Sequence, residues 1–322
     1  MRLSANTMFV LLSLLVAALP AGASDYSDKQ LLYVNSYHLG YPGSDPIAEG
    51  IRSVLDPAGI EWRVLYMDTK RNPSEAFARA AAQRVRAEIE GLRPDVVIAS
   101  DDNASKYLIE PYYRDAELPF VFCGVNWDAS VYGFPYRNVT GMVEVALVPE
   151  ILSHLRRYAE GERIGFLAGD RMSERKNLEH YQRRFGIRFE QVYFATDFAQ
   201  WKESFRRLQG EVDMVMMTSH VGIPGWDDQA AQAFVEEQVR VPVGTEHAWE
   251  MPLALVGVLK DFQEMGEWSA RAALRILDGV SPTQIPITAN QRGRLLFNSR
   301  IAARLGIEDL PAMAELFPAE HD

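Results

Sequence analysis

The chain has 322 residues, a formal net charge of −11 and a single cysteine. This length exceeds what one ordinary hydrophobic core supports, so we expect two domains. The acidic balance argues against nucleic-acid binding, which depends on neutralising phosphates, and the lone Cys123 excludes an intramolecular disulfide.

The N-terminus has the residue order of a secretory signal peptide. Arg2 precedes an almost wholly apolar run, 8–19, which is followed by Pro20 and small residues. The run is shorter than the ~18 apolar residues that cross a bilayer, so an uncleaved anchor helix is the weaker alternative. We expect a signal peptide over 1–23, export to the periplasm and no stable membrane insertion. Since no cysteine follows the cleavage point, we do not expect a lipoprotein.

Strands and helices alternate along the first half of the mature chain. Short apolar runs predict strands at 31–35, 62–67, 96–99 and 120–123. Amphipathic segments predict helices at 45–55, 74–92 and 103–113. Alternation of this kind is typical of a mainly parallel, doubly wound α/β sheet.

A second series of the same kind follows residues 138–144. Its predicted helices are 149–158, 173–185, 198–208 and 227–238, and its predicted strands are 164–167, 189–194, 214–218 and 241–243. A strand at 253–258, a helix at 264–277 and a strand at 294–297 remain. The pattern predicts two Rossmann-like α/β lobes joined by a hinge with several crossings. The expected lobes are 29–142 plus 247–282 and 143–246 plus 283–322.

Polar and aromatic residues follow several predicted strands. Because the carboxyl ends of parallel strands share one edge, where open α/β sheets bind ligands, we expect these residues to form a binding site. The candidates in the first series are Ser36, Tyr37, Tyr41, Ser100, Asp101, Asp102, Asn126, Trp127 and Glu144. The candidates in the second series are Asp170, His220 and Glu246.

The chemistry of these candidates favours a small ligand that carries an amine or another cationic group. A buried carboxylate without a partner is costly, and a ligand cation would supply that partner. Tyrosine and tryptophan rings suit the walls of a small-molecule pocket. Helix capping and hydrogen bonds between the lobes are the alternative roles for the same side chains.

Enzyme signatures are missing from the sequence. There is no Gly-x-Ser-x-Gly, His-Glu-x-x-His, Walker or Gly-x-Gly-x-x-Gly motif. We therefore expect no catalytic residue, no metal site and no cofactor. A secreted hydrolase that uses Asp101 or Glu144 as acid or base is a third possibility, but no nucleophile and base pair is visible.

Several segments together resemble a family of periplasmic ABC-transporter substrate-binding proteins. The segments that carry the resemblance are 34–41, 67–71, 100–104, 122–126, 140–144, 270–279, 285–286 and 297–298. The resemblance runs from about Leu31 to Leu310. The order Ser100-Asp101-Asp102-Asn103 is similar to a branch of the family that forms the sensor half of some histidine kinases and diguanylate cyclases.

The resemblance implies a type I periplasmic-binding-protein fold and a periplasmic protein that closes two lobes over one small polar organic molecule. Its implied partner is an ABC permease, which the closed form would contact, and we expect a monomer. The alternative is a periplasmic ligand-sensing subunit that signals to a membrane histidine kinase or diguanylate cyclase. The family includes proteins that bind aromatic amino acids, so the ligand could be an amino acid.

Overall fold

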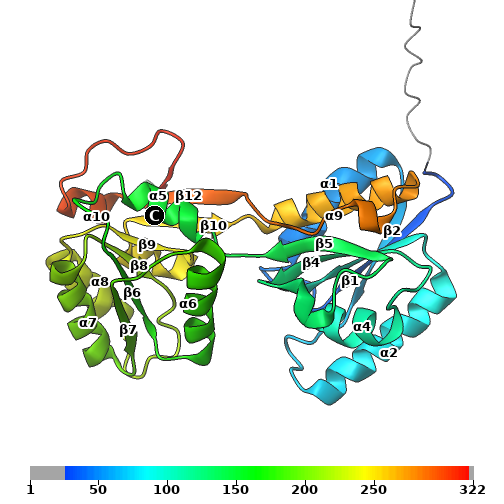
Figure 1. Ribbon diagram of the computed structural model, residues 1–322, viewed down its shortest axis with the longest axis horizontal. Coiled ribbons are helices and arrows are strands. Elements are labelled where there is room, and N and C mark those ends of the chain that lie inside the picture. Colours follow the sequence, from blue (N-terminus) through cyan, green and yellow to red (C-terminus); the bar gives the residue numbers. More distant parts are fainter. Residues whose placement is uncertain (1–25, 319–322) are drawn as a thin grey trace, which may run out of the picture.

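The computed structural model describes residues 26–318 and contains two α/β lobes (Figure 1). The expected signal peptide lies outside the described residues. In the described part of the chain, no helix is both long enough and apolar enough to span a membrane. The predicted fold class, two doubly wound lobes joined by a hinge, is confirmed.

The first lobe is built on a parallel sheet of strand order β11-β5-β4-β3-β1-β2. Its strands are β1 (Gln30–Asn35), β2 (Glu61–Tyr66), β3 (Val96–Ser100), β4 (Phe120–Asn126), β5 (Val139–Glu144) and β11 (Thr288–Ala289). Its helices are α1 (Asp45–Ala58), α2 (Glu75–Leu92), α3 (Asp101–Ala104), α4 (Glu110–Tyr112) and α9 (Phe262–Leu277). The central strand β3 is wholly buried, as its apolar β-branched sequence predicts.

The second lobe has a seven-stranded sheet of order β13-β12-β10-β9-β8-β6-β7. Its strands are β6 (Ile164–Gly169), β7 (Gln191–Ala195), β8 (Met214–Met217), β9 (Val243–Thr245), β10 (Val256–Lys260), β12 (Gly293–Asn298) and β13 (Glu315–Phe317). Its helices are α5 (Val148–Leu155), α6 (Met172–Phe185), α7 (Phe198–Glu211), α8 (Asp228–Gln238) and α10 (Ser299–Arg304). The pair β10 and β12 is antiparallel, and the other pairs are parallel.

Two glycines allow α9, which comes late in the sequence, to pack closely against α1 in the first lobe. A Cβ atom at Gly50 of α1 would collide with the Gln263 carbonyl of α9, and one at Gly266 would collide with the Ile47 carbonyl. The two helices therefore pack with their backbones in close contact, which only glycine permits. This contact holds α9 over the first sheet, where Met265 and Ala273 join the same apolar cluster as Ile51.

The chain crosses between the lobes after β5, after β10 and after β11 (Figure 1). The predicted lobe boundaries differ from the sheets at two points. Strand β10 was expected in the first lobe but pairs with β9 and β12, and β11 was expected in the second lobe but pairs with β5. A short apolar strand fits either parallel sheet equally well, so sequence pattern does not assign it.

Two local predictions also change. The segment 139–144, for which no strand was predicted, is the strand β5, and its residues Val139 to Val143 are buried. The single helix expected at 103–113 is divided into α3, a π-helical turn (Ser105–Ile109) and α4. Pi turns are frequent at functional sites, and this one directly follows the candidate residues Asp101 and Asp102.

Candidate functional site

Backbone strain gathers at the carboxyl end of the first sheet, which we call the first rim. Asp68, Asp101 and Trp127 follow β2, β3 and β4, and their φ angles are +57°, +72° and +62°. Residues with a side chain rarely adopt this left-handed region, and such strain concentrates at functional sites. On β4, Gly124 has a φ of +68°, and a Cβ there would lie 3.2 Å from Asp101 Oδ1. The backbone of β4 thus approaches the Asp101 side chain closely at the first rim.

Asp101 is the unusual residue of this rim. Asp101 is 8% exposed, and within residues 26–318 its Oδ2 has no hydrogen-bond partner. Burial raises the pKa of the carboxyl well above its ordinary value, and the charge of Glu144 raises it further, while the Ser100 hydroxyl and, to a smaller extent, the charge of Lys70 oppose the rise. A carboxylate in this environment gains strongly from any cation that reaches it.

The two candidate serines hold Asp101 in place. Ser36 Oγ donates to the Ser100 carbonyl over 2.6 Å and accepts from the Ala104 amide over 2.9 Å. The Ser100 hydroxyl lies 3.0 Å from the Tyr33 hydroxyl. Both serines are fully buried, and these bonds connect β1, β3 and α3. Ser36 and Ser100 therefore position the loop that carries Asp101.

Asp102 connects the loop after β3 to the segment after β4. Its carboxylate accepts from Asn126 Nδ2 over 2.6 Å and from the Tyr132 hydroxyl over 2.8 Å. Tyr132 lies in a short 3-10 turn (Ala129–Tyr132). These donors leave Asp102 better satisfied than its neighbour Asp101.

Two tyrosines form the aromatic part of the first rim. The rings of Tyr37 and Tyr41 meet edge to face with centroids 4.8 Å apart. Lys70 Nζ lies 5.1 Å from the first centroid and 5.0 Å from the second. Burial raises the pKa of the Tyr37 hydroxyl, and the charges of Asp101, Asp102 and Glu144 add to this rise, which places these groups around one ring.

An ion-paired lysine lies where two interlobe crossings leave their sheets. Lys260 Nζ, at the end of β10, donates to Glu144 Oε1 at the end of β5 over 2.6 Å, and both side chains are mostly buried. Burial lowers the pKa of Lys260, but Glu144 and Glu246 outweigh it and the pKa is raised. Glu246 also accepts a hydrogen bond from the buried Tyr181 hydroxyl.

The corresponding edge of the second sheet, the second rim, has acids with partners. Asp170 pairs with Arg175 over 2.8 Å, and His220 Nδ1 lies 2.6 Å from Glu250 Oε1. The imidazole of His220 also stacks on Trp226 with centroids 4.0 Å apart. A neighbouring cavity of about 440 Å³ is lined by Arg171, Ser173, Glu174, Ser219, Val221 and Trp249.

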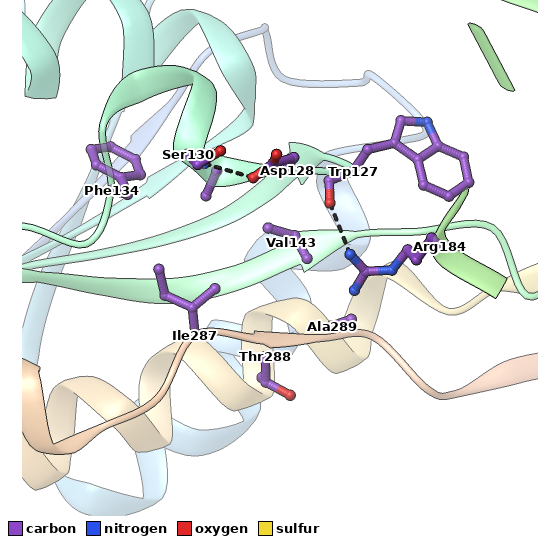
Figure 2. Close-up of a pocket in the computed structure, with 10 residues that line it drawn as sticks. Trp127, Asp128, Ser130, Phe134, Val143, Arg184, Ile287, Thr288 and Ala289 are labelled. Carbon is purple, nitrogen blue, oxygen red and sulfur yellow. Dashed lines mark hydrogen bonds between the residues drawn. The ribbon is translucent and has the colours of Figure 1, made fainter. Parts of the chain in front are cut away.

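Trp127 contacts the second lobe. Its ring stacks on His180 of α6 at 4.7 Å, and its carbonyl accepts from Arg184 Nη1 over 3.2 Å. Figure 2 shows the cavity of about 390 Å³ beside this contact, with Arg184 across from Val143 and Thr288. This cavity lies at the β5–β11 edge, where the crossings run, and Trp127 joins the lobes there.

The structure brings together part of the predicted set. Tyr37, Tyr41, Asp101, Asp102 and Glu144 share one electrostatic environment on the first rim, with Asn126 bound to Asp102. Within residues 26–318, Asp170 and His220 bond only to residues of the second lobe. Sequence reasoning missed Lys70, Lys260, Tyr132 and Glu174. For Lys70, its place in the segment 67–71 after a predicted strand was an available signal.

The comparisons with known proteins bear on the whole chain. Residues 36–314 match the family model described as ABC transporter substrate binding protein. A comparison with curated proteins found no match. A ligand-free, open substrate-binding protein with adhesive properties from Clostridium difficile aligns with a TM-score of 0.68 at 15% identity, covering 91% of this chain and 100% of its own.

Two further structures share the fold. A conserved domain protein from Vibrio cholerae has a TM-score of 0.56 at 18% identity, and an ABC domain in complex with L-Trp from Streptococcus pneumonia has 0.54 at 15%. Each covers 89% of this chain and 99% of its own. At these identities the likeness concerns the fold, whereas the family model spans most of the sequence. The chain therefore belongs to the ABC transporter substrate binding protein family.

Proposed function

We propose that this protein is a periplasmic solute-binding protein of an ABC transporter, and that its ligand is a small organic molecule with a cationic group. The observation that carries the proposal is Asp101, a buried and strained carboxylate that has no counterion in contact among residues 26–318 and that lies near Tyr37. Aromatic faces and a desolvated carboxylate are the chemistry that recognises an ammonium group.

Closure of the two lobes completes the binding step. The rims lie on separate lobes joined by three crossings, so a ligand that contacts both rims favours the closed form. Moving a mostly open population to a mostly closed one requires several kcal/mol of preference for the closed state. Asp101 supplies the ion pair on the first rim, and Trp249, which is 52% exposed, offers an apolar surface on the second.

The test separates charge from shape with two matched triplets. The aromatic triplet is phenethylamine, L-phenylalanine and 3-phenylpropionate, and the aliphatic triplet is pentylamine, L-norleucine and hexanoate. Each triplet keeps one body and changes only the charged groups. We expect the melting temperature of the purified protein to rise most with the amine or the amino acid and least with the carboxylate.

A larger rise with either carboxylate, or no rise with any of the six compounds, would contradict the cation assignment. Native mass spectrometry of freshly purified protein adds a direct observation, since a retained molecule should carry an amine. Ligand uptake is then compared between cells that contain the protein and cells that lack it. This comparison separates transport from the alternative role as a sensor subunit, because only transport requires the ligand to enter the cell.

A further inference from the structure

The aromatic pair on the first rim is already occupied by a cation from the protein itself. Lys70 Nζ lies about equally far from the Tyr37 and Tyr41 ring centroids, at 5.1 and 5.0 Å. Within residues 26–318, no carboxylate oxygen lies within 4.0 Å of this ammonium. The two rings are therefore its partners, and cation–π attraction accounts for its position.

The other charged groups of this region are paired in a different way. Arg71, the residue after Lys70, holds Asp68 through bonds of 2.7 and 2.9 Å. Glu144 pairs with Lys260. In the described part of the chain, Asp101 has no contacting counterion, although the charge of Lys70 acts on it from nearby. The lysine ammonium thus partly neutralises the carboxylate without bonding to it.

We propose that Lys70 is a resident cation that occupies the Tyr37–Tyr41 pair in the ligand-free protein, and that the cationic group of the ligand displaces it. This inference rests on the proposed function. Displacement makes Lys70 a specificity residue, because a ligand must bind the rings and Asp101 better than a tethered ammonium does. A weakly interacting cation fails this competition, whereas an organic ammonium that also fills the rest of the site succeeds.

The test compares the full mature protein with Lys70→Met, which removes the charge and keeps most of the aliphatic stem. Calorimetric titration with phenethylamine should show a Kd about tenfold lower for Lys70→Met, the size expected for two weakened cation–π contacts. Lys70→Arg keeps the charge and should retain the wild-type Kd within about threefold. The matched control is Lys202→Met, which removes the ammonium over Phe198 in the second lobe and should leave the Kd unchanged.

A second readout follows the lysine directly. In protein whose lysines carry ¹³C-dimethyl groups, the Lys70 signal is the one that Lys70→Met lacks, and the tyrosine rings should shift it upfield. Addition of phenethylamine should move it toward the position of a free lysine. This observation separates displacement from a simple change of local charge.

The outcomes distinguish the two proposals. If neither the wild type nor Lys70→Met binds phenethylamine, the proposed function fails. If the wild type binds the amine but Lys70→Met binds it equally or less tightly, or if the Lys70 signal stays in place, the displacement is wrong and the proposed function stands. A selective loss of L-phenylalanine binding in Lys70→Met would instead make Lys70 a receptor for a ligand carboxylate, and would also overturn displacement.

Discussion

The two rims of this protein pair their carboxylates differently. On the first rim, Asp101 has a left-handed backbone, a pKa raised by burial and, among the residues that the structure describes, no contacting cation. On the second rim, Asp170 has Arg175 and Glu250 has His220. The nearest counterpart of Asp101 is Glu174, which is 6% exposed and also has an unpartnered oxygen.

The difference between Asp101 and Glu174 comes from their backbones. Glu174 lies in the first turn of the 14-residue helix α6, where the helix dipole and free amides favour a negative charge. Asp101 is the first residue of α3, which has only four residues, and its own backbone is strained, with a left-handed φ of +72°. The strained backbone and the uncompensated carboxylate therefore destabilise the folded protein at Asp101 but not at Glu174. Such local destabilisation is typical of functional positions. We infer that the first rim selects the ligand and the second rim closes over it.

The largest expected effect is the loss of amine binding in Asp101→Asn. Removing one partner of a buried charge pair costs about 3 to 5 kcal/mol, so the Kd for phenethylamine should rise by roughly 100-fold or more. Calorimetric titration measures this. Asp170→Asn changes an acid that already has an arginine partner on the second rim, and it should alter the Kd by less than about threefold. Equal effects of the two variants would remove the distinction between the rims.

The next effect concerns the ion pair between the crossings. Lys260→Met should lower the free energy of unfolding by about 2 to 3 kcal/mol, because Glu144 and Glu246 lose a mostly buried counterion. Arg175→Met breaks the more exposed pair with Asp170 and should cost about 0.5 kcal/mol or less. Urea unfolding followed by circular dichroism measures both. A similar loss of unfolding free energy in both variants would show that the Lys260–Glu144 pair contributes no more to stability than an exposed ion pair.

A smaller effect tests the cost of keeping Asp101 charged. Because its pKa is raised in the folded state, the charged form destabilises the ligand-free protein at pH values above that pKa. Asp101→Asn should therefore be more stable than the wild type by about 1 kcal/mol or more at pH 8, since one unit of pKa shift is ~1.4 kcal/mol. The gain should be smaller at pH 5, because the stability that a raised carboxyl pKa removes is regained as the pH falls toward the ordinary carboxyl range. Unfolding curves at both pH values check the sign.

The smallest effect sharpens the comparison between the two unpartnered acids. Glu174→Gln should weaken phenethylamine binding by less than about tenfold, because the helix N-terminus already compensates this carboxylate. Asp101→Asn, measured beside it, should weaken binding at least ten times more. The reverse order would assign ligand selection to the second rim.

The sequence predicted the elements of the fold better than their assignment to lobes. Buried strands such as β3 and the long helix α2 follow from apolar periodicity and from the Ser74 cap. The sheet that β10 joins depends on which strands are available to pair with it in the folded protein, and a local sequence pattern does not show this. The close packing of α1 on α9 at Gly50 and Gly266 is equally non-local.

The candidate site was predicted as a set of strand ends, without the roles of its members. Asp101, Asp102 and Glu144 were named because parallel strands share an edge. That Ser36 and Ser100 hold a loop, and that Trp127 packs on His180, depends on side-chain directions that a sequence pattern does not specify. Lys70 was missed because an exposed lysine in a turn is ordinary until two rings are found beneath it.

The most direct test of the role of Asp101 is the proton balance of ligand binding. Phenethylamine is titrated calorimetrically at pH 6.5 in phosphate and in imidazole buffer, whose ionisation enthalpies differ, and its own ammonium stays charged at this pH. If the ligand cation draws Asp101 into its charged form, the wild type releases protons on binding and Asp101→Asn releases none. Binding by the wild type without any proton release between pH 5 and pH 8 would contradict the account.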